Sequence, residues 1–328
     1  MVTGTPLYGY LNGYNHQYNQ NLKHEEEEEE EEVPNFLLRL LPTKPKLSTK
    51  DLPWLVGNPT SQKSRFKFWL RAMDRASTLS CLLVNSFPGE DGQTDDDESS
   101  EIEIGPRIFQ IGPLLASNNG TNLLLPTMWE EDKSCTDWLE TQPPASVIYI
   151  SFGSWVGPIG HEKIAELALG LEATKRPFLW VLKDDAAWRN GLPAGFIDRT
   201  AGRGKVVSWA PQEAVLAHRA VGCYVTHCGW NSTVEGVRHG KRLVCYPIAG
   251  DQFVNCNFIV RVWGIGIRPN GFGRGEIEDS IKRVMEGEEG EEIQERVLGL
   301  KEKVMGGKGR CRAWANLQLF VNEIKKAQ

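Results

Sequence analysis

The stretch GCYVTHCGWNSTVE, residues 222–235, decides the fold that this sequence predicts. It begins with an apolar run typical of a buried strand, which ends at His227. Gly229 then leads into a helix that opens with Asn231 and Ser232. A strand that passes through a short turn into a helix is the repeating unit of sheets covered by helices.

The same order of elements recurs on both sides of this stretch. VIYISFGS (147–154) reads as a strand that ends in Gly-Ser, and residues 161–173 have helical periodicity. Further apolar runs occur at FLWVL (178–182), KVVSWA (205–210), RLVCYP (242–247) and GIGIR (264–268). Strands that alternate with helices predict an α/β fold with a doubly wound parallel sheet. Ligands bind such sheets beyond the carboxyl ends of the strands, so polar residues there are the candidates for function.

The chain before this sheet is less regular. Residues 1–32 end in eight glutamates and offer too little apolar surface to offset the entropy of ordering, so we predict disorder. A helix is expected around residues 66–76, a strand at 82–87 and a second short strand within FQIGPLL (109–115). The acidic stretch 89–103 reads as a solvated loop, and SNNGTN (117–122) reads as a linker.

Composition excludes several classes of protein. The chain has 328 residues, 40% apolar and 24% charged, and no apolar run approaches the ~18 residues that span a bilayer. Its start has no secretory signal, and its seven cysteines lack CxxC spacing, so we expect reduced thiols and a cytoplasmic protein. The net charge of −6 comes from the glutamate run, and the near-neutral remainder lacks the basic patch that nucleic-acid binding requires.

Two strand ends suggest contacts to phosphate. Gly153 and Ser154 follow a strand directly, and such a turn brings backbone N–H groups close to an anion, although it could serve chain reversal alone. Asn231 and Ser232 open the helix after Gly229, where free N–H groups and the helix dipole favour negative charge. The alternative is that Asn231 or Ser232 only caps the helix.

His227 and Glu235 belong to the same strand–helix unit. His227 could donate to a diphosphate, and metal ligation competes because Cys223 and Cys228 are near in sequence. Their spacing does not match a usual zinc pattern, so no metal is expected. Glu235 could accept hydrogen bonds from a ribose diol, or it could be a first-turn charge favoured by the helix dipole.

Three further residues follow other strands. Trp209 stands before Ala-Pro-Gln, where its ring could stack on a nucleobase, although most tryptophans only pack. Asp251 and Gln252 follow RLVCYP and suit sugar hydroxyls, but they could equally begin the next helix.

The joint arrangement of these residues carries a resemblance. WAPQEAVLAHRAVGCYVTHCGWNSTVEGVRHGKRLVCYPIAGDQ, the 44 residues 209–252, closely resembles the signature box of plant secondary-product glycosyltransferases, the plant family 1 UDP-glycosyltransferases. The resemblance extends through CTDWLETQPPASVIYISFGS, RPFLWVL and FVNCNFIV and covers roughly residues 80–328. It implies a GT-B fold, with one Rossmann-like domain for the donor and one mainly for the acceptor.

The resemblance also implies roles for single residues. Trp209 would stack on uracil, and Ala210 would bind its edge through the backbone. Gln212 and Glu235 would hold the ribose. The diphosphate would be held by Ser154, His227, Gly229, Asn231 and Ser232, and the sugar would face Trp230, Asp251 and Gln252. Gln252 favours UDP-glucose as the donor, and the family inverts the anomeric carbon without a metal or other cofactor.

The sequence departs from its family in the acceptor domain. Relatives carry a histidine base after their first strand, and neither His16 nor His24 follows an apolar strand, so no catalytic residue is assigned. We expect a disordered segment 1–32, a remnant of the acceptor domain at 33–125, a donor domain at 126–310 and a helix at 311–328 that packs back on the remnant. Most of the acceptor domain is then absent, which predicts weak or no transfer and an exposed face open to a protein partner.

Two other functions are weighed against transfer to a small lipophilic plant metabolite. A module that binds UDP-sugar or a protein partner without turnover is the main alternative. A dinucleotide-dependent oxidoreductase is excluded because no GxGxxG follows the first strand of the sheet.

Overall fold

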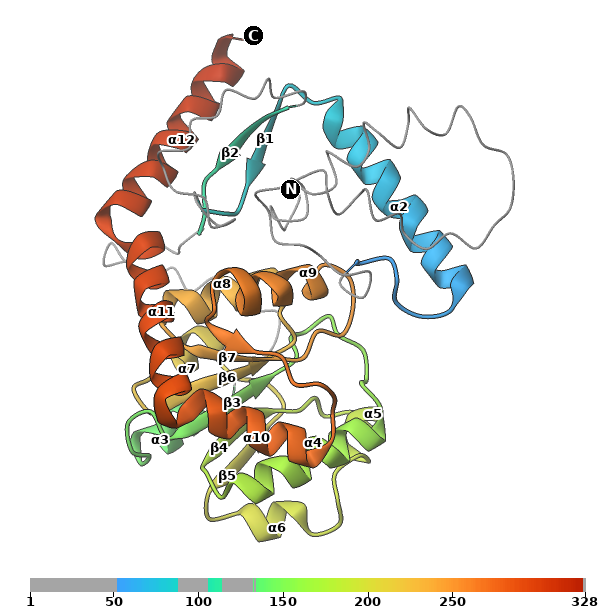
Figure 1. Cartoon of the computed structure of the whole chain (residues 1–328), viewed down its shortest axis with the longest axis vertical. Helices are drawn as coiled ribbons and strands as arrows, with labels where there is room; N and C mark the ends of the chain where they lie inside the picture. Colours follow the sequence, from blue (N-terminus) through green and yellow to red (C-terminus); the bar gives the residue numbers. More distant parts are fainter. Residues whose placement is uncertain (1–51, 88–105, 114–131, 133, 327–328) are drawn as a thin grey trace. The chain divides into compact units, whose positions relative to one another are not determined.

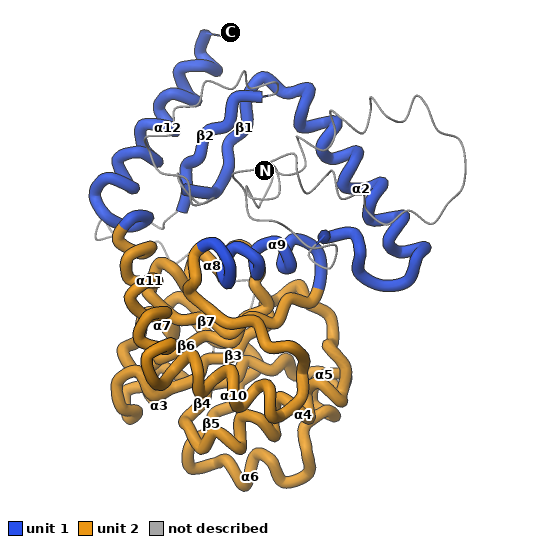
Figure 2. Tube along the Cα trace, viewed as in Figure 1, with its two compact units in different colours: residues 1–115, 249–262, 303–328 blue, residues 116–248, 263–302 orange. Residues whose placement is uncertain are grey.

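The computed structural model describes residues 52–87, 106–113, 132 and 134–326. The chain divides into two compact units, the first formed by residues 1–115, 249–262 and 303–328 and the second by residues 116–248 and 263–302 (Figure 2). The predicted disordered segment, acidic loop and linker lie outside the described residues, and the predicted domain bounds remain a prediction.

A six-stranded sheet forms the centre of the second unit (Figure 1). Its strands are β3 (Val147–Ser151), β4 (Phe178–Val181), β5 (Gly204–Val207), β6 (Val221–Thr226), β7 (Arg242–Cys245) and β8 (Gly266–Ile267). All pairs are parallel, in the order β5-β4-β3-β6-β7-β8. The chain runs outward from β3 to β5 and returns to the other side of β3 with β6. The predicted doubly wound sheet is confirmed, and its switch point, where ligands bind in such folds, lies between β3 and β6.

Helices follow the strands of this unit. They are α3 (Ser134–Glu140), α4 (His161–Thr174), α5 (Ala186–Arg189), α6 (Phe196–Thr200), α7 (Gln212–Ala217), α8 (Trp230–Arg238) and α10 (Arg274–Met285), and α11 (Gly287–Met305) begins in this unit. The central strands β3 and β6 are buried along their whole length. Continuous apolar strands of this kind are typical of parallel sheets covered on both faces.

The alternation of side chains along β3 separates the two faces of the sheet. Ile148 and Ile150 belong to a core cluster with Ile164 of α4 and Ile277 of α10. Tyr149 points to the opposite face, where its hydroxyl reaches α7. One face therefore carries the main apolar core, and the other carries polar groups beside α7 and α8.

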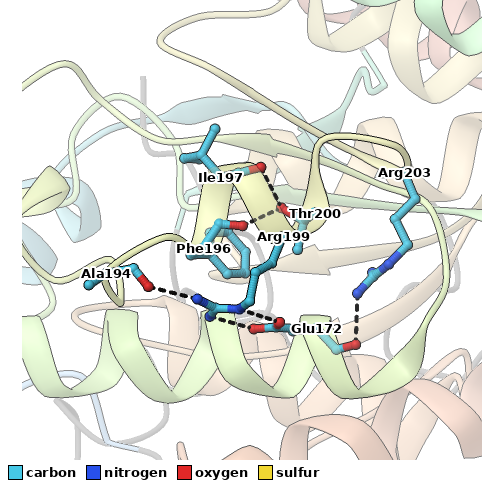
Figure 3. Close-up of polar contacts among 7 residues, drawn as sticks. All are labelled: Glu172, Ala194, Phe196, Ile197, Arg199, Thr200 and Arg203. Carbon is cyan, nitrogen blue, oxygen red and sulfur yellow. Dashed lines mark hydrogen bonds and ion pairs between the residues drawn. The ribbon is translucent and has the colours of Figure 1, made fainter.

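A cluster of polar contacts joins α6 to α4 (Figure 3). Arg199 donates two hydrogen bonds to the carboxylate of Glu172, at 2.7 and 2.9 Å, and a third to the carbonyl of Ala194 at 2.7 Å. Arg203 donates to the backbone carbonyl of Glu172 at 2.8 Å. These contacts hold the loop between β4 and β5 against the core.

The first unit contains α2 (Pro59–Ser77), a parallel strand pair β1 (Cys81–Val84) and β2 (Arg107–Gln110), α9 (Gln252–Asn257), a π-helical segment Phe258–Val262 and α12 (Gly307–Lys326). The expected helix at 66–76 begins seven residues earlier, because the side chain of Asn58 caps it and Pro59 occupies its first turn. None of the described helices combines the length and the apolar composition needed to cross a membrane.

Helix α12 packs on β2 within the first unit. The rings of Phe109 and Phe320 meet edge to face, with centroids 5.6 Å apart. Asn316 donates from Nδ2 to the carbonyl of Gln110 at 2.8 Å. An edge strand of a two-stranded sheet is thereby covered by a helix, which protects its exposed side.

Candidate functional site

Two loops leave the sheet side by side at the switch point. Ser151, the last residue of β3, stands opposite Thr226, the last residue of β6. The residues that follow them, Gly153 with Ser154 and His227 with Gly229, therefore lie at one edge of the sheet. The sequence prediction placed its phosphate-binding candidates in these two loops.

Two glycines enclose the ring of His227. A Cβ placed on Gly153 would lie 2.7 Å from Cε1 of His227, and a Cβ placed on Gly229 would overlap its Nε2. Gly153 also has φ +74°, a conformation that other residues adopt only at a cost. The imidazole is therefore held in a slot that only glycine neighbours leave open.

The charge state of His227 follows from this burial. Only 8% of the residue is exposed, and burial, followed by the nearby charge of Lys183, lowers the pKa of His227 to about 4. The imidazole is therefore neutral at pH 7 and has one N–H to donate. An oxygen ligand at this edge would receive a hydrogen bond from His227 but no full positive charge.

Lys183 is a residue that the sequence prediction missed. It lies two residues after the end of β4, and its Nζ donates to the carbonyls of Ser154 at 2.8 Å and Val156 at 2.7 Å. Burial lowers the pKa of this lysine. Its position just beyond a strand end, at the edge where ligands bind, was the signal that could have found it. Lys183 fixes the loop after β3 and brings a cation to this edge.

The amino terminus of α8 forms the next part of the site. Gly229 is the N-cap residue, and no side chain makes a capping hydrogen bond. The alternative that Asn231 or Ser232 merely caps the helix is therefore wrong. The turn before it is shaped by Cys228, which has φ +64° and donates its N–H to Oγ1 of Thr226 at 3.1 Å. A helix start of this form attracts anions through its N–H groups and its dipole.

Gln212 and Glu235 meet although 23 residues separate them in the sequence. Nε2 of Gln212 donates to Oε2 of Glu235 at 2.5 Å and to Oγ of Ser232 at 3.2 Å. Glu235 lies in the second turn of α8, and α8 has no acidic residue in its first turn, so the first-turn interpretation is wrong. Burial raises the pKa of Glu235 to about 7, against the opposing hydrogen bond from Gln212. The pair combines an acceptor and a donor, both half-buried, at the start of α7 and in α8.

The aromatic candidates occupy different environments. Trp209 is half-buried, follows the end of β5, and accepts a hydrogen bond through its carbonyl from the N–H of Asp132 at 3.2 Å. The next residue, Ala210, is buried. Trp230 is only 3% exposed, and the centroid of its ring lies 6.4 Å from that of Trp263. Trp230 is therefore packed in the interior, and its contact with a sugar remains a prediction.

Asp251 and Gln252 belong to the first unit, which includes residues 249–262. Asp251 is the N-cap residue of α9, and its Oδ2 accepts a hydrogen bond from Nδ2 of Asn255 at 3.0 Å. Oε1 of Gln252 accepts a hydrogen bond from the N–H of Ala249 at 2.9 Å. The interpretation that these residues begin the next helix is confirmed, and their contact with a sugar remains a prediction.

Comparison with known families decides the class of protein. The model of the family described as UDP-glucoronosyl and UDP-glucosyl transferase matches residues 102–298. This range includes the whole six-stranded sheet and every predicted site residue. The chain belongs to this family. Its similarity to plant members confirms the resemblance to plant family 1 UDP-glycosyltransferases.

Curated relatives of this UDP-glycosyltransferase chain come from plants. UDP-glycosyltransferase 82A1 of Arabidopsis thaliana is 47% identical over 298 residues, which cover 86% of this chain and 64% of the relative. UDP-glycosyltransferase 76B1 of the same species is 39% identical over 271 residues, with 80% and 58% covered. The chain thus spans about three fifths of the length of these relatives.

Solved structures of plant glycosyltransferases share the fold. Phytolacca americana UGT2, complexed with UDP-2fluoro-glucose and pterostilbene, matches with a TM-score of 0.78 and 27% identity, covering 98% of this chain and 70% of that one. The UDP-glucose: anthocyanidin 3-O-glucosyltransferase, in complex with UDP, matches with a TM-score of 0.79 and 27% identity, covering 98% and 69%. This UDP-glycosyltransferase chain therefore has the GT-B fold, with a complete donor-type sheet and a small two-stranded sheet in its other unit.

Proposed function

We propose that the second unit binds a UDP-sugar and that the protein transfers a hexose, with glucose favoured, to a hydroxyl of a small plant metabolite. The observation that carries the proposal is the half-buried contact between Gln212 and Glu235 at the switch-point edge of the sheet. A buried carboxylate is costly unless a ligand or a neighbour donates to it. A ribose diol supplies two hydroxyl donors of the kind that such a carboxylate accepts.

The diphosphate is assigned to the helix start beside this pair. Gly229, Asn231 and Ser232 offer N–H groups and side-chain donors at the positive end of α8, and His227 offers a neutral N–H. Ser154 belongs to the loop after β3, to which Lys183 donates a hydrogen bond. The proposal adds Lys183 as the cation that favours an anion at this edge.

The residues that contact the uracil ring and the sugar are assigned from the sequence pattern. Trp209 stacks on uracil, and the backbone of Ala210 binds the uracil edge. Trp230, Asp251 and Gln252 face the sugar. The solved relatives complexed with UDP or UDP-2fluoro-glucose support a uridine nucleotide and favour glucose. Pterostilbene in one of them supports a small phenolic acceptor.

The transfer step inverts the anomeric carbon. A base deprotonates the acceptor hydroxyl, and the oxygen attacks the anomeric carbon from the face opposite UDP. The bond between the anomeric carbon and the diphosphate oxygen breaks, and its electron pair leaves with UDP. The described part of the first unit contains no histidine that could be this base. For the chain as given we therefore propose weak or no transfer, and a UDP-sugar-binding module without turnover is the second candidate.

Calorimetric titration with UDP tests the donor site without a choice of acceptor. Glu235→Gln keeps the shape of the side chain and removes the charged acceptor, so UDP affinity should fall by about tenfold or more. Glu172→Gln is the matched control, because this carboxylate lies in the α4–α6 cluster (Figure 3), and its UDP affinity should match the wild type. A folded wild-type chain that does not bind UDP contradicts the proposal.

Turnover separates the two candidate functions. Once the chain is shown to bind UDP, it is incubated with UDP-glucose and a panel of phenolic acceptors, and the release of UDP is measured. Binding without release supports the module, whereas acceptor-dependent release shows that the chain supplies a base of its own.

A further inference from the structure

Two tyrosine hydroxyls converge on one atom of the candidate ribose site. The hydroxyl of Tyr149 lies 3.1 Å from Oε1 of Gln212, and that of Tyr224 lies 3.2 Å from the same oxygen. Neither tyrosine belongs to the residues that the sequence prediction assigned to the nucleotide. Both come from the central strands of the sheet.

The sheet itself aligns the two phenols. Tyr149 of β3 and Tyr224 of β6 are register partners, so their side chains leave the same face at the same level. Their rings are stacked, with centroids 5.1 Å apart and an angle of 28° between the planes. At most 1% of either residue is exposed. Neither ring can move without disturbing the core.

The chemistry of the two hydroxyls makes them fixed donors. Burial raises the pKa of Tyr224 to about 12 and that of Tyr149 well above its usual value, so both remain protonated at neutral pH. A buried hydroxyl needs a hydrogen-bond partner, and the carbonyl oxygen of an amide has two lone pairs to offer. Oε1 of Gln212 can thus accept from both tyrosines at once.

This double contact fixes which way the amide of Gln212 faces. With its oxygen occupied by the tyrosines, its NH₂ group must face Glu235 and Ser232, where it donates at 2.5 and 3.2 Å. Without the tyrosine hydroxyls, a half-turn of the amide would place its oxygen against the carboxylate of Glu235. The amide would then repel the group that it now supports.

We propose that Tyr149 and Tyr224 are positioning residues for nucleotide recognition: they lock the amide of Gln212 so that it and Glu235 present a preformed receptor to the ribose diol. The proposal rests on the proposed function, because it assigns Gln212 and Glu235 to the ribose. It predicts that the two phenols act on selectivity for the ribose hydroxyls and leave the rest of nucleotide binding intact.

The test compares UDP with 2′,3′-dideoxyuridine diphosphate, which lacks the ribose hydroxyls. The wild-type chain should prefer UDP by about tenfold or more, as expected for hydrogen bonds to a charged group. In the double variant Tyr149→Phe with Tyr224→Phe the preference should fall to about threefold or less, while the affinity for the dideoxy nucleotide stays within about twofold of the wild type. Calorimetry measures both ligands on each variant.

Tyr246→Phe is the matched control. Tyr246 is also buried in the second unit, but its hydroxyl has no hydrogen-bond partner among the described residues, Gln212 included. Its preference for UDP should equal that of the wild type. If the double variant does not fold, the single variants decide, and each should lose part of the preference.

The outcomes separate the two proposals. An unchanged preference in the tyrosine variants, or an equal loss of both nucleotides, overturns the positioning role and leaves the UDP site in place. A wild-type chain that binds UDP without preferring it overturns the ribose assignment and the positioning role together. A folded wild-type chain that binds neither nucleotide overturns the proposed function.

Discussion

At the scale of single residues, Glu235 shows how the fold changes the environment of a side chain. The sequence shows one carboxylate near the start of a helix. In the structure this half-buried carboxylate accepts a hydrogen bond from Gln212, which also donates to Ser232. Arg238 favours its charged form, whereas burial and the charge of Glu213 oppose it. Burial is the largest of these effects, and it raises the pKa of Glu235 from 4.5 to about 7.

This shift predicts how stability depends on pH. Because the folded pKa lies above the unfolded one, Glu235 contributes stability that is fully present below pH 4.5 and is lost as pH rises through about 7. The loss relative to Glu235→Gln, which does not titrate, is about 3 kcal/mol. Denaturant unfolding of both proteins at pH 5 and pH 8 measures it. A stability difference that is the same at both pH values contradicts the prediction.

At the scale of elements, the turn from β6 into α8 combines a strand end, a buried histidine and a helix start. Gly229 has φ −60° and ψ 142°, which any residue can adopt, so glycine is not required there by the backbone. It is required by the ring of His227, which a Cβ would overlap. The turn is therefore constrained by what it encloses.

Gly229→Ala tests this constraint. The added methyl group should push His227 out of its slot and lower UDP affinity by about tenfold, with a stability cost of about 1–3 kcal/mol. Calorimetry and denaturant unfolding measure the two effects. Gly299→Ala, where a Cβ meets no atom within 4 Å, is the control. It should leave UDP affinity unchanged and should not lower stability, because Ala favours the interior of helix α11 over Gly.

Combining Gly229→Ala with His227→Ala shows whether the displaced imidazole ring causes the loss of UDP affinity. In His227→Ala the slot is empty, so adding Gly229→Ala should have little further effect on UDP affinity. A full additional loss in that background would mean that the methyl group blocks the ligand directly.

At the scale of the whole molecule, the candidate nucleotide-binding residues other than Asp251 and Gln252 all belong to the second unit. A ligand that binds only the folded state stabilises the part of the chain that forms its site. Nucleotide should therefore stabilise the unit built on the six-stranded sheet. UDP should stabilise the first unit less, and only to the extent that its unfolding is coupled to that of the second unit.

UDP at 100 times its dissociation constant should raise the unfolding free energy of the second unit by about 2.7 kcal/mol. Differential scanning calorimetry with and without UDP measures the shift. Glu235→Gln at the same UDP concentration should show a smaller shift, because less of it is occupied. If UDP raised the unfolding free energy equally in both proteins, the nucleotide would bind at a site that does not include Glu235.

Sequence patterns alone predict the class of fold, which the structure confirms, and the location of the candidate site, which stays a prediction. Apolar runs gave the positions of the strands because buried parallel strands have few polar residues, and the glycine turns after them gave the edge where ligands bind. Element ends were less accurate. The strand expected at 205–210 ends at Val207, since the carbonyl of Trp209 pairs with Asp132 and Pro211 has no N–H to continue the ladder.

Only the tertiary structure decided how the site residues act together. The strand order brings β3 beside β6, and this pairing places Tyr149 and Tyr224 in register beneath Gln212, which no local pattern reveals. Burial then sets the pKa of Glu235, because desolvation depends on every element that surrounds the carboxylate. Sequence patterns report local preferences along the chain, whereas hydrogen bonds across 23 or 63 residues depend on how the sheet folds those segments together.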